Sequence, residues 1–240
     1  MRVRVEGVSS GRLQDASFEI AAGQVLGIAG VDGNGQAELE AVLAGRASFD
    51  GTIEMDDRTL ALRNPGDRIT AGIAYITSDR YRFGLVRALD LADNLLLGRM
   101  PRWLPGRRRR HDMAAPRLAG WDVRAHGPGT ITGTLSGGNA QKVVLAREMD
   151  EDIRFVLACH PTRGLDPEAA ASVARRVLER ASDGAAVLWI GAELDELFEV
   201  SDELLVMAGG RLVGPFHAPY DRGAIGLVMS GEALAATESP

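Results

Sequence analysis

The sequence contains a single lysine, Lys142, among 27 basic residues, and all the others are arginines. Genomic base-composition bias is the simplest cause of this excess. It still has a chemical consequence, because any reaction that needs a lysine must use Lys142 or do without one. The chain also has a single cysteine, Cys159, which excludes an internal disulfide and gives no sign of an oxidising compartment.

Aromatic residues make up only 5% of the chain, which argues against a base-stacking platform for single-stranded nucleic acid. The net charge of −6 and the pI near 5.3 argue against general binding to phosphate backbones. No run approaches the ~20 apolar residues that span a bilayer, and residues 1–6 lack the apolar core of a signal peptide. We therefore expect a cytoplasmic protein, which another protein must hold if it works at a membrane.

The composition, 45% hydrophobic and 25% charged over 240 residues, is that of a globular protein with one large α/β domain or two small ones. Strand-like apolar runs alternate with helical patterns, which favours a parallel sheet. The predicted strands are 25–29, 72–76, 155–158, 186–190 and 203–207, and the predicted helices include one after Gly35 and one over 167–181.

The remaining segments differ from this alternation. The first twenty residues predict two short strands, and residues 52–62 predict a hairpin. Residues 88–125 start as a helix over 89–97 and continue as a segment rich in Arg, Pro and Trp, which indicates an inserted, more helical subdomain. We expect residues 233–240 to be frayed.

A glycine-rich turn joins the strand over 25–29 to the following helix. Such a turn aims backbone N–H groups and a helix N-terminus at a phosphate. The full phosphate-binding pattern G-x-x-x-x-G-K-[ST] is not complete, because Gln36 and Ala37 stand where the lysine and the hydroxyl residue belong. Alone, this turn is equally compatible with an ordinary strand-to-helix connection. The candidate nucleotide-binding residues are Gly30, Asp32, Gly33, Asn34, Gly35, Gln36 and Ala37.

A second glycine motif, LSGGNAQK over residues 135–142, precedes another predicted helix, and PTRGLD follows it at 161–166. These segments resemble the signature and the D-loop of ATP-binding-cassette (ABC) ATPases. By this resemblance the signature candidates are Leu135, Ser136, Gly137, Gly138, Asn139 and Gln141. The D-loop candidates are Gly164, Leu165 and Asp166.

Further matches to the family occur in the family's order over residues 1 to 215, with a Q-loop region at 72–86 and a segment at 195–207. The chain most resembles the second, degenerate cassette of tandem ATP-binding proteins from bacterial sugar and nucleoside importers. The resemblance implies a P-loop NTPase ABC cassette with a RecA-like core, a small antiparallel β subdomain and an inserted helical subdomain. The expected single domain has its core at 1–87 and 140–218, the helical subdomain at 88–139 and a tail at 219–240.

The resemblance also shows which hydrolytic elements are missing. Cys159 and His160 end the strand where the family has two carboxylates, and neither is a hard oxygen ligand for Mg²⁺. Asp150 to Asp152 precede that strand and belong near its opposite end. Ala192 replaces the switch histidine, and Ser78 replaces the Q-loop glutamine or glutamate. We therefore predict no catalytic residue, no metal ligand and no ATP hydrolysis at this chain's own loop.

The intact signature implies a role in a pair of cassettes. In the family, ATP lies between one cassette's phosphate loop and the other's signature, so Ser136, Gly137 and Gly138 would cap the γ-phosphate of a partner's ATP. ATP would bind weakly at the chain's own loop or only across the interface, with Mg²⁺ only at the partner site. The expected partners are a second cassette and transmembrane permease subunits. They would keep the chain at the inner face of the bacterial plasma membrane.

Three alternatives stay open. An active ATPase would need Arg or backbone groups to replace the missing lysine, and a purely structural half of a cassette dimer would bind no nucleotide. The run Arg107 to Arg110 after Trp103 suggests an ABC-fold protein that acts on RNA or ribosomes. Because the net charge is negative and there is one such run, we favour a solvated or membrane-adjacent loop and expect no nucleic-acid partner.

Overall fold

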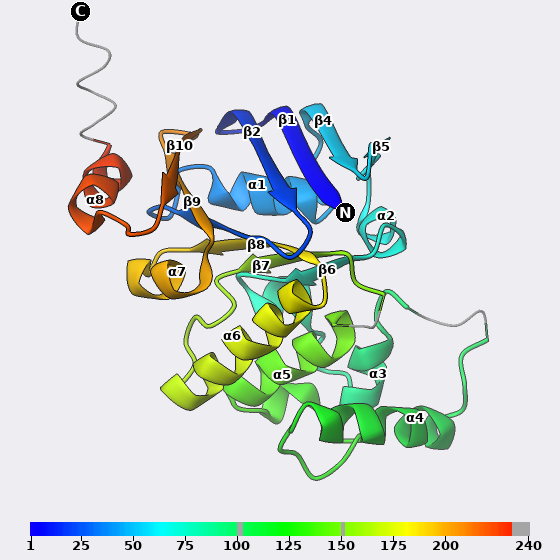
Figure 1. Ribbon diagram of the computed structural model, residues 1–240. Helices are drawn as coiled ribbons and strands as arrows, with labels where there is room; N and C mark the ends of the chain where they lie inside the picture. Colours follow the sequence, from blue (N-terminus) through cyan, green and yellow to red (C-terminus); the bar gives the residue numbers. More distant parts are fainter. Residues whose placement is uncertain (100–102, 150–151, 232–240) are drawn as a thin grey trace, which may run out of the picture.

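A six-stranded sheet in the order β10-β9-β3-β8-β7-β6 forms the centre of the computed structural model, which describes residues 1–99, 103–149 and 152–231 (Figure 1). The strands are β3 (Val25–Ala29), β6 (Ile73–Ile76), β7 (Phe155–Cys159), β8 (Ala186–Gly191), β9 (Glu203–Ala208) and β10 (Arg211–His217). Neighbouring strands are parallel except for β10, which pairs antiparallel with β9. The parallel sheet predicted from the alternating pattern is confirmed.

A second, antiparallel sheet has the order β2-β1-β4-β5. Its strands are β1 (Arg2–Ser10), β2 (Leu13–Ala21), β4 (Asp50–Met55) and β5 (Arg58–Thr59). The predicted hairpin is confirmed, although its second strand is only two residues long. The turn consists of Asp56 and Asp57, both with positive φ (51° and 58°), and aspartate tolerates this conformation better than bulkier residues.

The helices include the predicted one over 167–181 and the predicted one near 89–97. They are α1 (Gln36–Leu43), α2 (Pro65–Thr70), α3 (Leu91–Leu96), α4 (Arg107–Gly120), α5 (Gly137–Glu148), α6 (Pro167–Ser182), α7 (Leu194–Val200) and α8 (Arg222–Ser230). A π-helical turn, η1 (Arg80–Gly84), and a 3-10 turn, η2 (Thr132–Thr134), complete them. Within the described ranges, none of these helices has the length and apolarity that crossing a membrane requires.

The two faces of the parallel sheet bury different residues, because successive side chains of a strand point to opposite sides. In β7, Phe155 and Leu157 pack with α1 and the antiparallel sheet, whereas Val156 and Ala158 pack with α6 and α8. Figure 1 shows this layering, with α1 between the two sheets and α6 below the central sheet. Every residue of β7 is buried, as expected for a central parallel strand.

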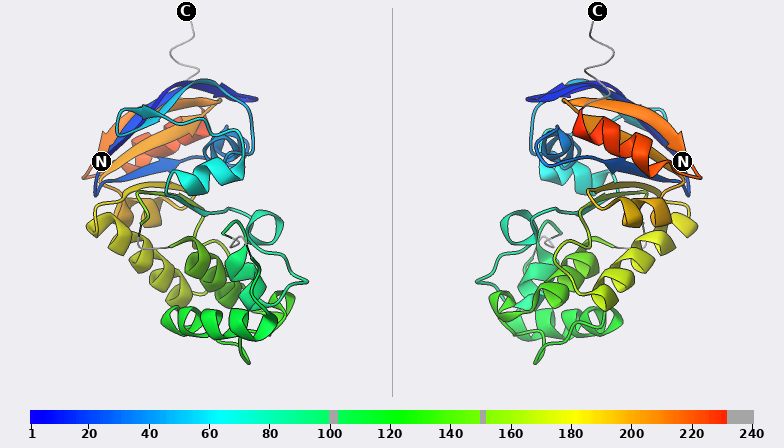
Figure 2. Two further views of the ribbon diagram at one scale, coloured as in Figure 1. Left: turned by 90° about the vertical axis from the view of Figure 1, so that its right-hand side faces the viewer. Right: turned by 90° about the vertical axis from the view of Figure 1, so that its left-hand side faces the viewer.

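The third apolar cluster joins α3, α4 and α5 through residues such as Leu91, Leu118 and Val143. Both views of Figure 2 place these helices on the side of the central sheet away from the antiparallel sheet. This cluster includes α5 residues as far as Ala146, beyond the subdomain boundary expected at residue 139. On its other side, α5 packs against the central sheet through Leu145. The helix that carries the signature motif is therefore shared by both parts of the molecule.

The segment expected as a C-terminal tail, 219–240, contains α8. α8 starts at its N-cap Asp221, whose Oδ1 accepts hydrogen bonds from the N–H groups of Gly223 and Ala224. Its apolar side chains Ile225 and Val228 are buried against the sheet. Apolar burial at helical spacing thus holds α8 on the sheet. The segment predicted to fray, 233–240, lies outside the described residues.

A buried ion cluster fixes the C-terminal end of α5. The Glu148 carboxylate is 3% exposed and binds Arg68 of α2 (Oε2 to Nη1, 2.8 Å) and Arg147 (Oε1 to Nε, 2.9 Å). It also accepts the Tyr75 N–H of β6 at 3.2 Å, while Arg147 donates to the Gly84 carbonyl at 2.6 Å. Burial alone would raise the pKa of Glu148, but the two arginines lower it overall.

We expect Glu148→Gln to lower the free energy of unfolding by about 3 kcal/mol, because it leaves two buried guanidinium groups without their counter-charge. Urea unfolding followed by circular dichroism measures this. Since the pKa of Glu148 is lower in the folded state, its contribution is present at neutral pH and declines as the pH falls below the ordinary value of 4.5. The loss caused by the substitution should therefore shrink at acidic pH.

The matched control is Glu179→Gln, on an exposed position of α6 for which the described residues provide no ion pair. It should change stability by less than about 0.5 kcal/mol. Equal effects of the two substitutions would contradict a special role for the Glu148 cluster.

Candidate functional site

The loops that follow the parallel strands meet at one edge of the central sheet, because parallel strands all end on the same side. This edge brings together the glycine turn after β3, Ser78 after β6, His160 after β7 and Ala192 after β8. The predicted phosphate-loop and strand-end residues therefore share one region of the fold, although they are up to 160 positions apart in the sequence.

The glycine turn is held by neighbouring turns. Gly33 and Gly35 have φ values of 94° and 118°, which a side chain would strain, so the turn needs glycine at both positions. The Asn34 carbonyl accepts a hydrogen bond from the Gly210 N–H in the β9–β10 turn at 2.9 Å. Arg12, in the β1–β2 turn, donates from Nη1 to the Gly33 carbonyl at 2.7 Å. The loop is thus built into the fold at several points.

The side chain of Gln36 lies inside this turn and is 6% exposed. Its Nε2 donates to the Val31 carbonyl at 3.1 Å, and its Oε1 accepts the Asn34 N–H at 3.1 Å. A Cβ on Gly30 would lie 2.2 Å from Gln36 Nε2, so Gly30 leaves the space that the amide fills. One backbone N–H that a phosphate-binding turn offers to its ligand is therefore bound to this chain's own glutamine.

Ala37, the next residue, is exposed and presents a methyl group. A methyl group has no lone pair for a metal ion, whereas Mg²⁺ in phosphate-binding loops takes a serine or threonine hydroxyl. The position that follows Gln36 thus offers no ligand atom from its side chain.

Cys159 and His160 diverge at the end of β7. Cys159 is buried in the cluster between the sheets, and burial raises the pKa of its thiol well above the ordinary value. His160 has φ 45°, and its N–H donates to the Ile190 carbonyl at 2.7 Å. Burial lowers the pKa of His160, with nearby Asp32 opposing the shift, so the ring is neutral at neutral pH. The Cys159 thiol is thus a buried group of the apolar core.

Asp32 of the glycine turn faces the D-loop. Its carboxylate pairs with Arg163 (Oδ2 to Nη2, 3.5 Å) and lies 3.9 Å from His160 Nε2. These residues line a cavity of about 280 Å³ together with Ala192 and Glu196. The side chains at this end of the turn are thus an aspartate, the arginine that pairs with it and a neutral imidazole.

A carboxylate that the sequence analysis missed, Glu40 of α1, reaches Ser78. The Glu40 side chain is buried; its Oε2 accepts the Ser78 hydroxyl at 2.7 Å and its Oε1 accepts the Ser78 N–H at 3.2 Å. Oε1 also accepts the Tyr75 hydroxyl at 2.5 Å, and burial together with Glu40 raises the pKa of Tyr75. The only sequence signal was an acidic residue on an apolar helix, one turn after Gln36.

The signature motif forms the N-terminus of α5, where Ser136 is the N-cap. Its hydroxyl oxygen accepts the Asn139 N–H at 3.5 Å and the Asn139 side-chain amide at 3.0 Å. Ser136 is exposed, so its hydroxyl and the first backbone N–H groups of the helix are accessible from outside the molecule. Leu135, which precedes the cap, packs against the helical cluster and orients the turn.

Arg80, a second residue that sequence reasoning missed, lies behind the signature glycines. Its Nη1 donates to the Arg163 carbonyl of the D-loop at 3.2 Å. A Cβ on Gly137 would lie 3.0 Å from Arg80 Nη2, and a Cβ on Gly138 would lie 3.4 Å from the Ala169 methyl. The two glycines thus allow close approach of the Q-loop arginine and of α6. The signal in the sequence was the charged pair directly after Ser78.

The signature candidates Asn139 and Gln141 lie in different surroundings. Asn139 is partly exposed, and its Oδ1 accepts the Arg124 N–H at 2.7 Å. Gln141 is 1% exposed and donates to the Pro161 carbonyl at 3.0 Å. The position of Gln141 on α5 thus turns its side chain toward the segment that follows β7 within its own chain.

The D-loop candidates make a turn into α6. Gly164 has φ 70°, Leu165 packs against the second apolar cluster, and Asp166 is the N-cap, with Oδ1 accepting the Ala169 N–H at 2.9 Å. The carboxylate of Asp166 therefore serves its own helix in this chain.

The single lysine also has a defined place. Lys142 Nζ binds the Asp122 carboxylate at 2.7 Å and the Asp122 carbonyl at 2.9 Å, and the lysine side chain is 16% exposed. Its hydrogen bond and charge lower the pKa of Asp122. Lys142 therefore ties α5 to the turn after α4.

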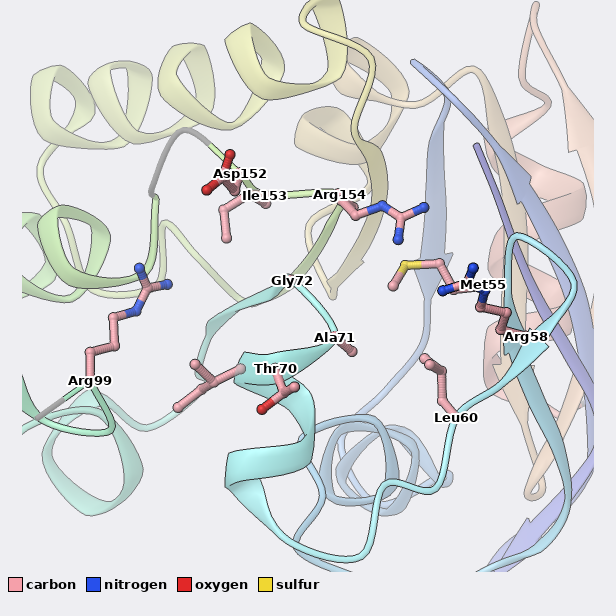
Figure 3. A pocket seen from close by; sticks show the side chains of 11 residues that line it. Met55, Arg58, Leu60, Thr70, Ala71, Gly72, Arg99, Asp152, Ile153 and Arg154 are labelled. Atoms are coloured by element: carbon pink, nitrogen blue, oxygen red, sulfur yellow. The ribbon is translucent and has the colours of Figure 1, made fainter. Parts of the chain in front are cut away.

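A cavity of about 630 Å³ lies at the opposite edge of the sheet (Figure 3). Gly72 and Arg154, which precede β6 and β7, line it with Asp152, so the prediction that Asp152 lies away from the strand end is confirmed. Asp150 and Glu151 lie outside the described residues. Arg154 forms an ion pair with Asp56. This cavity is therefore separate from the glycine turn.

The described part of the chain contains no group of three or more His, Cys, Asp or Glu residues placed to hold a metal ion.

The chain is similar to known proteins in both sequence and structure. A family model described as ABC transporter matches residues 13–163. The chain is 38% identical over 216 residues to the ribose import ATP-binding protein RbsA 3 of Rubrobacter xylanophilus, covering 88% of this chain and 44% of that protein. It is 35% identical over 227 residues to the guanosine import ATP-binding protein NupO of Bacillus subtilis, covering 91% and 44%. The chain thus spans less than half the length of these curated relatives.

Solved structures share the whole fold. An ATP-binding cassette of an ABC transporter in its ADP conformation is 22% identical, with a TM-score of 0.76 and coverage of 98% of each chain. A nucleotide-free ATP-binding cassette from an ABC transporter is also 22% identical, with a TM-score of 0.76 and coverage of 96% of each chain.

Proposed function

Because the chain belongs to the ABC transporter family, whose cassette fold it shares, we propose that it is one nucleotide-binding domain of an importer. In this proposal its own phosphate loop does not hold Mg-ATP, and it supplies its signature to ATP held by a partner cassette. The relatives named for ribose and guanosine import support a sugar or nucleoside as the transported solute.

The main support for a phosphate loop that does not hold Mg-ATP is the side-chain amide of Gln36, which lies inside its own turn. A phosphate would have to displace this amide and would gain no lysine charge in return. The residues present do not fit Mg²⁺ either, since Ala37 has no hydroxyl and β7 ends in a buried thiol and a neutral imidazole. The positions carried over from the family as nucleotide-binding therefore retain the shape of the loop without its charge.

The second part is supported by the exposed N-terminus of α5. The Ser136 hydroxyl and the first backbone N–H groups lie at the positive end of a 12-residue helix. The guanidinium of Arg80 lies directly behind Gly137 and adds positive charge there. A γ-phosphate presented by a partner cassette would meet these donors already in place, and positioned charge is most of what phosphoryl transfer requires.

The proposal assigns this chain two kinds of partner. A second cassette would provide the complete phosphate loop and the Mg²⁺, and permease subunits would hold the pair at the inner face of the plasma membrane. A structural half-dimer that contacts no nucleotide is the alternative, because the filled turn of Gln36 is equally compatible with it. The two functions differ in the signature, which contacts ATP in our proposal and contacts no nucleotide in the structural half-dimer.

We expect the purified chain to bind ATP at most weakly and to show no turnover of Mg-ATP above background. The double substitution Gln36→Lys with Ala37→Ser replaces the amide by a cation and supplies a hydroxyl, so ATP affinity should rise at least about tenfold without turnover, because the strand end still lacks a carboxylate. Isothermal titration calorimetry and a phosphate-release assay measure the two quantities. Turnover by the unmodified chain would overturn the first part of the proposal.

We expect Ser136→Arg to lower kcat of the complex with a complete cassette by about 100-fold or more, since a bulky cation would block the capping hydroxyl. Steady-state ATPase assays of the assembled transporter measure this, with copurification of the subunits as the check on assembly. Ser182→Arg, at the exposed far end of α6, is the matched control and should leave kcat unchanged. Unchanged kcat in Ser136→Arg would favour the purely structural half-dimer.

A further inference from the structure

The run of four arginines takes no part in the site described above. It forms the first turn of α4, which begins at Arg107 after the N-cap Gly106. Figures 1 and 2 place α4 at the end of the molecule farthest from the antiparallel sheet. Its location is therefore remote from the glycine turn, and its charge needs a separate explanation.

One of the four arginines is used inside the molecule. Arg110 binds Asp93 of α3 (Nε to Oδ1, 2.6 Å) and donates to the Pro105 carbonyl at 2.9 Å. The next residue, His111, lies 3.2 Å from Asp90 through Nε2. These contacts fix the start of α4 to α3, so the arginines on its outer side are presented by a rigid element.

The other three arginines face solvent. Arg107, Arg108 and Arg109 are exposed, and within the described ranges their side chains make no ion pair or hydrogen bond. The first turn of α4 has no acidic residue and no side-chain cap, although the N-terminus of a helix disfavours cations. Asp112 is the one acidic side chain of α4. A net positive charge thus gathers here on a chain whose total charge is −6.

Large apolar side chains stand beside this charge. Trp103 is 85% exposed and Leu104 is 54% exposed, only a few residues before the arginines, and Met113 on α4 is 53% exposed. Burial of Trp and Leu is strongly favoured in water, so an almost fully exposed tryptophan indicates an unsatisfied contact. Tryptophan next to basic residues is the composition of segments that lie at a membrane–water interface.

We propose that Trp103, Leu104, Arg107, Arg108 and Arg109, here called the basic patch, bind the anionic headgroups of a lipid bilayer. Three arginines near an anionic surface strengthen binding on the order of 100-fold, and the indole inserts at headgroup level. RNA is the less favoured polyanion, because the chain is acidic overall and offers one short patch. This contact is in addition to the attachment through permease subunits and does not rest on the nucleotide chemistry proposed above.

The test uses the purified chain and vesicles of phosphatidylcholine with or without phosphatidylglycerol, in a flotation assay at low and at physiological salt. We expect binding only with phosphatidylglycerol, weaker at higher salt. Arg107→Gln, Arg108→Gln and Arg109→Gln together should reduce it by roughly 100-fold. The control replaces three exposed arginines elsewhere, Arg58→Gln, Arg63→Gln and Arg211→Gln, which changes the net charge equally and should keep binding.

Insertion of the indole has its own readout. Brominated lipids should quench the fluorescence of the unmodified chain, and Trp103→Phe should abolish that quenching because the other tryptophans, Trp121 and Trp189, are partly and fully buried. Equal binding to both vesicle types, equal losses in the two triple variants, or no quenching would each overturn the proposal. Patch-dependent binding of an RNA oligonucleotide without vesicle binding would replace lipid by nucleic acid. Circular dichroism verifies that all variants fold.

Discussion

The buried carboxylate of Glu148 determines where α5 lies, and the rest of the candidate site depends on that helix. Glu148 joins the C-terminal end of α5 to α2 and to the backbone of β6, while Arg147 joins it to the end of η1. At the other end, about 18 Å away for 12 residues, Ser136 begins the helix. Lys142 and Gln141 hold the middle to the turn after α4 and to Pro161. The signature is therefore fixed relative to the sheet edge that carries the glycine turn.

The two halves of the nucleotide machinery differ in how their polar groups are satisfied. In the glycine turn, Gln36 and Asp32 are engaged with other groups of the chain, as is Ser78 beside it. Buried donors and acceptors that already have protein partners gain little from a ligand that must break those bonds. At the start of α5 the exposed Ser136 has only local partners and faces outward. The polar groups of the glycine turn are thus bonded within the chain, whereas the Ser136 side chain is exposed.

Much of the fold could be predicted from sequence, because buried parallel strands such as β3 and β7 appear as short apolar runs, and the cassette fold followed from the order of the motifs. The site was predicted less well. The position of Gln141 depends on the direction of its side chain, and no motif specifies that a residue in the second turn of a helix reaches a carbonyl 20 positions away. Glu40 and Arg80 act through contacts between distant segments, which spacing along the chain does not encode.

The glycine turn is the place where the scarcity of lysine matters physically, because Gln36 stands there in the lysine position of the phosphate-loop pattern. Arginine serves well wherever this fold uses it, since Arg68 and Arg147 each bind a carboxylate and a backbone carbonyl with one planar group. A guanidinium group has no room inside the glycine turn. The smaller amide of Gln36 already packs so closely that a Cβ on Gly30 would lie 2.2 Å from its Nε2. The amide of Gln36 instead satisfies the turn from within, through the Val31 carbonyl and the Asn34 N–H. The turn therefore stays closed without a cation at position 36.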